Sequence, residues 1–194
     1  NDLCDPLGCM DSTKDQFAGT YIISTFASSL LLEGSSDRFK FQLAARATYL
    51  KEMLGVLRDA GLTDIELDYG FYDFQGRVSW ETESGDDEFA LSWYQGEDKL
   101  IFTPLFASWG NTAIPFNYKH RINNNLNFKS TTSFSKFEQR FELENIFAFL
   151  NNIYTTGTVN KVVWNADKEN QFEFGLQADY FDVDFTNEPI LLNA

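Results

Sequence analysis

The sequence predicts an α+β domain with a mainly antiparallel sheet and two principal helices. Apolar residues recur at helical spacing in two segments, 37–60 and 135–157. Outside these segments they alternate with polar residues at a period of two, which is typical of half-exposed strands. A chain of 194 residues with 43% hydrophobic residues is long enough for one domain of ordinary size. We therefore expect a flexible leader over 1–16 and a single domain over 17–194.

The first helix is expected from Asp37 to Ala60, and Gly61 is a typical helix end. It is expected to pack its apolar stripe on the sheet as the main core contact. For the preceding run, 17–32, strand and buried helix remain alternatives, with helix favoured at its end. The stripe of the helix consists of Phe39, Leu43, Ala47, Leu50, Leu54 and Leu57.

A meander of hairpins is expected after this helix. Acidic and apolar residues alternate over 64–69, and the segments 77–82, 88–94 and 99–105 continue the period of two, with a turn over 84–87. The next stretch, from Ala107 to Thr132, is rich in asparagine and lacks clear periodicity. It is therefore expected to be a linker or long loop.

A second helix is expected over 135–157, where a Ser-x-x-Glu capping box opens the segment. Strands are expected to follow at 161–164 and 171–180. The apolar phase then shifts by one residue between Tyr180 and Phe181, which is typical of a β-bulge or of a bend between two strands.

The two halves, 37–105 and 134–192, resemble copies of one helix-plus-meander unit. In this alignment Trp80 matches Trp164, at the first strand after each helix. If the duplication is real, both tryptophans are expected to be substantially buried against their own helix, because a large aromatic side chain fills the gap between a helix and a sheet. An accidental match of composition is the alternative.

The charge balance argues against nucleic acid as a partner. Fifteen basic and 29 acidic residues give a formal net charge of −14, which repels phosphate backbones. No run approaches the roughly 20 apolar residues that span a bilayer, so no transmembrane segment is expected. The oligomeric state does not follow from the composition.

Two cysteines near the beginning of the chain bear on its location. Cys4 and Cys9 lie in a polar, turn-rich segment, where they form either a local disulfide in an oxidising compartment or two inert thiols in a reducing one. We expect the disulfide. The chain begins at Asn1 without an initiator methionine, as it would after removal of a signal peptide. The expected location is extracytoplasmic: periplasm, cell surface or secreted.

Aromatic residues in the irregular middle of the chain are the candidate ligand-binding surface, because exposed aromatic rings stack against sugars or fill partner pockets. Filling of the core is the alternative role for them. The candidates are Trp93, Tyr94, Trp109, Phe116 and Tyr118.

The acidic clusters are expected to be exposed strand faces and turns rather than metal sites, because no segment matches the spacing of a calcium loop. His120 is the only histidine, and no motif of a nucleophilic or metal-dependent enzyme occurs. We therefore expect no catalytic residue, no metal and no cofactor. A pair of carboxylates can still catalyse hydrolysis without a local motif.

The run KLIFTPLFASWGNTAIPFNYK, residues 99–119, resembles a recurring pattern near the carboxyl end of β-rich surface lipoproteins of Bacteroidetes that have no assigned function. The resemblance covers about a tenth of the chain and includes no catalytic motif. It implies an extracytoplasmic binding or accessory protein, and it assigns no site residue.

The sequence therefore predicts a non-catalytic extracytoplasmic binding or accessory module whose partner is a protein, a glycan or a small apolar ligand. One alternative is a carrier that encloses an apolar ligand between sheet and helices. A carboxylate-based hydrolase is a further alternative. An exposed aromatic platform would favour the binding module, a closed apolar cavity the carrier, and paired carboxylates in a cleft the hydrolase.

Overall fold

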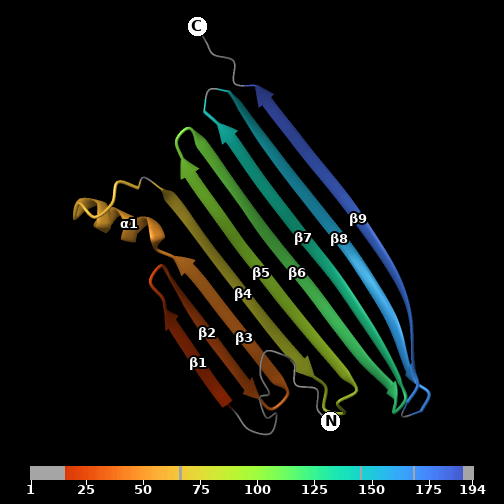
Figure 1. The fold of residues 1–194 in the computed structure, drawn as a ribbon. Coiled ribbons are helices and arrows are strands. Elements are labelled where there is room, and N and C mark those ends of the chain that lie inside the picture. The colour runs from red at the N-terminus through yellow and green to blue at the C-terminus, as the bar shows by residue number, and fades with distance from the viewer. Residues whose placement is uncertain (1–15, 66, 145, 168, 190–194) are drawn as a thin grey trace.

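The described part of the chain forms one antiparallel sheet of nine strands with one short helix (Figure 1). The computed structural model describes residues 16–189 apart from 66, 145 and 168. Each strand pairs with the next along the chain, so the strand order is the sequence order. The elements are β1 (Gln16–Ile23), β2 (Ala27–Ser36), β3 (Phe39–Thr48), α1 (Leu50–Asp59), β4 (Asp68–Glu81), β5 (Asp87–Phe102), β6 (Leu105–Asn123), β7 (Leu126–Leu143), β8 (Phe147–Asn165) and β9 (Gln171–Pro189).

The expected α+β class with two principal helices is wrong, and the first helix shows why. Residues 39–48 form β3, and only 50–59 are helical. A step of four residues is also an even step, so Phe39, Leu43 and Ala47 share one face of a strand as readily as one face of a helix. The first spacing of three residues runs from Ala47 to Leu50, and the helix begins at Leu50.

The second expected helix, 135–157, belongs to β7 and β8. Phe147 and Ile153 on β8 are six residues apart, an even number, so a strand also places them on one face. Phe141 on β7 shares that face because it lies opposite Phe149. The supposed duplication therefore fails, because strands occupy the segment where its second helix was expected. The end of 17–32, where a helix was favoured, is likewise strand, within β2.

The asparagine-rich stretch from Ala107 to Thr132 is also not a loop. It forms most of β6 and the beginning of β7, and only residues 124 and 125 lie outside a strand. In contrast, the turn predicted over 84–87 is confirmed: β4 ends at Glu81, β5 begins at Asp87, and Gly85 has φ 69°. A positive φ favours glycine, because a side chain is strained in that conformation.

The expected bulge between Tyr180 and Phe181 is absent. The register of β8 with β9 runs without interruption from Phe147 opposite Pro189 to Asn165 opposite Gln171. The phase shift in the sequence therefore reflects a regular strand whose apolar side chains change from one face of the sheet to the other along its length.

Residues that lie opposite each other in the register share a face, so the pairing divides all strands between two faces. We call face A the one that carries Phe39, Trp80 and Phe89, and face B the opposite one. Among exposed large apolar residues in strands, those on face A are Phe17, Tyr21, Ile23, Leu30, Phe39, Tyr72, Phe74, Trp80, Leu91, Ile114, Phe116, Phe134, Trp164, Phe172, Phe174, Leu176 and Tyr180. Those on face B are Ile22, Tyr94, Phe102, Phe181, Val183 and Phe185. Ile122 lies at the register shift between β6 and β7 and is assigned to neither face.

No second layer of described residues covers either face, and α1 lies beyond the ends of β3 and β4 (Figure 1). The only buried hydrophobic residues in the described part of the chain are Ala90 and Val163. The sheet is therefore held together mainly by its backbone ladder and by cross-strand side-chain pairs.

Candidate binding surface

Face A carries a row of aromatic rings at the end of the sheet where the β4–β5, β6–β7 and β8–β9 turns lie. Adjacent strands are about 4.8 Å apart, which brings rings at opposed positions within stacking distance. We call this set the aromatic row, and it consists of Phe39, Trp80, Phe89, Tyr118, Phe128, Trp164 and Phe172.

Most of these rings are stacked on a neighbour in the next strand. The ring centroids of Trp80 and Phe89 are 5.7 Å apart, and those of Phe89 and Tyr118 are 4.9 Å apart. At the other side of the row, Trp164 stacks on Phe172 at 5.5 Å. Trp80 and Trp164 are 48% and 46% exposed, so the burial expected for both tryptophans is not found. Each instead offers an oriented, half-exposed ring.

A hydrogen-bonded group fixes the centre of the row. The Tyr118 hydroxyl donates to Oδ1 of Asp87 at 2.7 Å, and Nδ1 of His120 lies 2.7 Å from the same oxygen. The bond from Tyr118, followed by that from His120, holds the pKa of Asp87 below its ordinary value. The same Tyr118–Asp87 bond raises the pKa of Tyr118. This bond restrains the phenol ring that stacks on Phe89.

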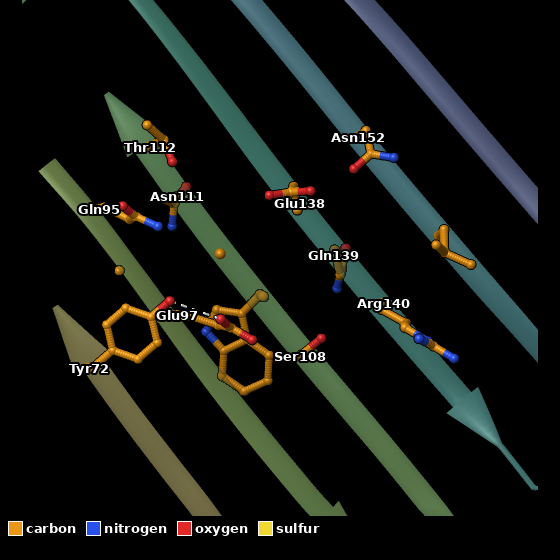
Figure 2. Close-up of a pocket in the computed structure, with 14 residues that line it drawn as sticks. Tyr72, Gln95, Glu97, Ser108, Asn111, Thr112, Glu138, Gln139, Arg140 and Asn152 are labelled. Atoms are coloured by element: carbon orange, nitrogen blue, oxygen red, sulfur yellow. Dashed lines mark hydrogen bonds between the residues drawn. The ribbon is translucent and has the colours of Figure 1, made fainter. Parts of the chain in front are cut away.

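A polar depression lies on face A towards the other end of the strands, across β4 to β8 (Figure 2). Its volume is about 260 Å³, and it opens to solvent. Gly110 lies between Glu97 and Glu138 in the register and has no side chain to fill the space between them. We call this depression the polar notch, and its face A residues are Tyr72, Gln95, Glu97, Ser108, Gly110, Thr112, Glu138, Arg140, Leu150 and Asn152.

Both carboxylates of the polar notch already have partners. The Tyr72 hydroxyl donates to Oε2 of Glu97 at 3.1 Å, a bond that raises the pKa of Tyr72. Nζ of Lys136 lies 2.6 Å from Oε1 of Glu138, and this contact raises the pKa of Lys136. The two glutamates are two strands apart, roughly 10 Å. The notch therefore offers hydrogen-bond donors and acceptors in open solvent.

The structure divides the aromatic residues predicted as a ligand-binding surface between the two faces. Trp93, Phe116 and Tyr118 lie on face A, whereas Tyr94 and Trp109 lie on face B. They are not one platform, because neighbouring residues in a strand point to opposite sides. Only Tyr118 belongs to the aromatic row.

Sequence reasoning missed most of the aromatic row. Trp80 and Phe89 flank the predicted turn over 84–87, and a hairpin brings residues equally distant from its turn together. The same holds for Trp164 and Phe172 around the turn between β8 and β9. Aromatic residues placed symmetrically about a turn were therefore the signal for these pairs.

Cys4 and Cys9 lie outside the described residues, so their disulfide stays a prediction. Among the described residues, no group of three or more histidine, cysteine or acidic side chains is arranged to hold a metal ion. The helix in the described part of the chain is not long and apolar enough to cross a membrane. Comparison of the chain with protein-family models, with curated proteins and with solved structures finds no match.

Proposed function

We propose that the chain is a non-catalytic extracytoplasmic binding module and that the aromatic row on face A is its binding surface. The row carries the proposal because Trp80, Trp164 and Phe172 are about half exposed and already oriented by stacking. Rigid aromatic side chains give large contact areas at a low cost in conformational entropy. The ligand is a molecule with flat apolar faces, such as the sugar rings of a glycan or the aromatic side chains of a protein.

The two alternatives from the sequence have less support. A carrier enclosing an apolar ligand between sheet and helices needs a helical layer, and α1 covers neither face (Figure 1). A carboxylate-based hydrolase needs an acid and a base in a sheltered cleft. Glu97 and Glu138 instead lie in an open depression, each bound to a neighbouring side chain. The extracytoplasmic location is supported by the cysteine pair and by the resemblance of residues 99–119.

Two tryptophans on opposite faces allow a matched test. Trp80 belongs to the aromatic row, whereas Trp109 lies on face B of the same sheet. Soluble oligosaccharides and aromatic-rich peptides can be titrated against the wild type, Trp80→Ala and Trp109→Ala, with binding followed by calorimetry. We expect Trp80→Ala to weaken binding about tenfold or more, which is typical of a buried aromatic anchor. Binding by Trp109→Ala should stay at the wild-type level.

The proposal is refuted if Trp109→Ala weakens binding as much as Trp80→Ala. It is also refuted if the ligands that bind are unaffected by Trp80→Ala. Circular dichroism of both variants checks that the sheet is intact, because each substitution removes one large side chain from the same sheet.

A further inference from the structure

The last strand of the sheet, β9, pairs with β8 over its whole length and with no other strand in the described part of the chain. Its outer edge therefore presents a 19-residue row of backbone groups at the side of the sheet (Figure 1). Edge strands are usually short, bulged, covered or charged, because an open edge is a template for pairing. Strand β9 is long, and its register with β8 has no bulge.

The charges of β9 have one sign. Between Gln171 and Asn187 the strand carries Glu173, Asp179, Asp182 and Asp184, and no lysine, arginine or histidine. A second β9 strand would therefore add only further carboxylates, and antiparallel pairing of two copies along this edge would bring like charges together. The other edge of the sheet, β1, has no charged residue with which to neutralise them.

Several carboxylates elsewhere in this sheet are neutralised by bases on the adjacent strand. Arg46 of β3 lies 2.6 Å from Asp73 of β4, and Lys161 of β8 lies 2.7 Å from Glu173 of β9. Such opposite-charge pairs across strands stabilise a sheet. On β9, Glu173 is therefore neutralised in the same way, by a base on the adjacent strand.

Asp182 and Asp184 are not neutralised in this way. Both lie on face A, and their opposed residues on β8 are Tyr154 and Asn152, which are uncharged. Neither aspartate has an ion pair within 4 Å among the described residues. The remaining adjacent position for a cation is the outer side of β9.

From Phe174 onward, the large apolar side chains of β9 are also more exposed than those of the inner strands. Leu176 is 82% exposed and Tyr180 is 68% exposed, both on face A, whereas Phe134 on β7 is 40% exposed. On face B, Phe181 and Val183 are 62% and 59% exposed. Side chains in a central strand are covered from both sides by neighbouring strands, so one further strand would cover these residues in the same way.

We propose that the outer edge of β9 takes an extended, basic strand of another polypeptide, which adds to the sheet by antiparallel pairing. Lysine or arginine side chains of that strand lie beside Asp182 and Asp184 on face A. Its alternate apolar side chains lie beside Phe181 and Val183 on face B. Backbone hydrogen bonds supply affinity in this kind of recognition, and the side chains set the register.

The probe is a synthetic peptide matched to residues 176–186 in antiparallel register. It carries lysine opposite Asp182 and Asp184 and valine opposite the apolar residues, and the control peptide has glutamate in place of both lysines. We expect the lysine peptide to bind at least about tenfold more tightly, measured by fluorescence anisotropy, because unlike charges across an interface select the partner. Amide hydrogen exchange over 176–186 should slow on binding, while exchange in β1 should not change.

A charge reversal separates this edge from general attraction to an acidic protein. The double variant D182K/D184K should prefer the glutamate peptide, whereas D59K/D64K, which makes the same change of charge away from β9, should keep the preference for lysine. Binding without reversal of preference would overturn the proposal. Protection of β1 in place of β9 would overturn it too, as would a dimer in sedimentation that excludes the peptide.

Discussion

Two glycines on β4 allow one substitution to be compared at two positions. Gly76 and Gly70 lie on face A of the same strand. Gly76 is opposite Trp93, and a methyl group built on Gly76 would overlap the indole ring. A methyl group built on Gly70 meets nothing within 4 Å. Alanine at these two positions should therefore have opposite effects on the free energy of unfolding.

The magnitude follows from two contributions. Replacing either glycine by alanine stabilises the protein by about 0.4–1 kcal/mol, because the unfolded chain loses conformational freedom. At Gly76 the ring of Trp93 must also move, away from a position 6.1 Å from the ring of Phe74. Such overpacking costs about 1–3 kcal/mol. Since the first contribution is shared, Gly76→Ala should be less stable than Gly70→Ala by about 1–3 kcal/mol.

Urea unfolding followed by tryptophan fluorescence measures this difference, and near-ultraviolet circular dichroism reports the environment of Trp93. The cost of Gly76→Ala should disappear in a Trp93→Val background, because the overlapping ring is then absent. Equal unfolding midpoints for Gly76→Ala and Gly70→Ala would refute the reasoning, as would a cost that persists without the indole ring.

Three further substitutions test the sheet and the helix. The hydrogen bond from Tyr118 holds the pKa of Asp87 below its ordinary value of 3.8, so its stabilising contribution is complete above that value and lost as the pH falls through the lower folded pKa. In thermal unfolding, the difference between wild type and Asp87→Asn should shrink as the pH falls below about 4; a difference that grows there would contradict this sign. Arg46→Ala should cost about 1 kcal/mol in urea unfolding, because Asp73, whose side chain is 14% exposed, loses its partner; an unchanged midpoint would show that the ion pair contributes nothing. Val56→Ala should change the stability by less than about 0.5 kcal/mol, since Val56 is 69% exposed on α1; a larger loss would mean that α1 packs against another surface.

The predictions from the sequence succeeded where the local pattern has one structural meaning. The alternation over 88–94 and the turn around Gly85 give strands β4 and β5 and the hairpin between them. They failed where the pattern has two meanings. A spacing of four residues, as between Phe39 and Leu43, places both side chains on one face of a helix and equally on one face of a strand. The local sequence therefore does not distinguish the two structures.

Asparagine was misleading for a related reason. Asn111 and Asn117 lie within β6, where the ladder with neighbouring strands on both sides outweighs their weak preference for strands. The ladder is a tertiary feature, because the backbone hydrogen bonds on each side of β6 are made with a strand formed elsewhere in the chain. The preference of a single residue type does not contain this contribution.

By itself, the sequence determined the acidic charge, the period-two alternation of most strands, the turn at Gly85 and the aromatic pairs that flank two of the hairpins, Trp80 with Phe89 and Trp164 with Phe172. Only the tertiary structure decided that these pairs form one row. Strands β5 and β6 have similar lengths, so the chain returns to the same end of the sheet and brings Tyr118 beside Phe89. The physical reason is that register across several strands is cumulative: it depends on the length of every intervening strand and turn, whereas a local pattern specifies only one hairpin at a time.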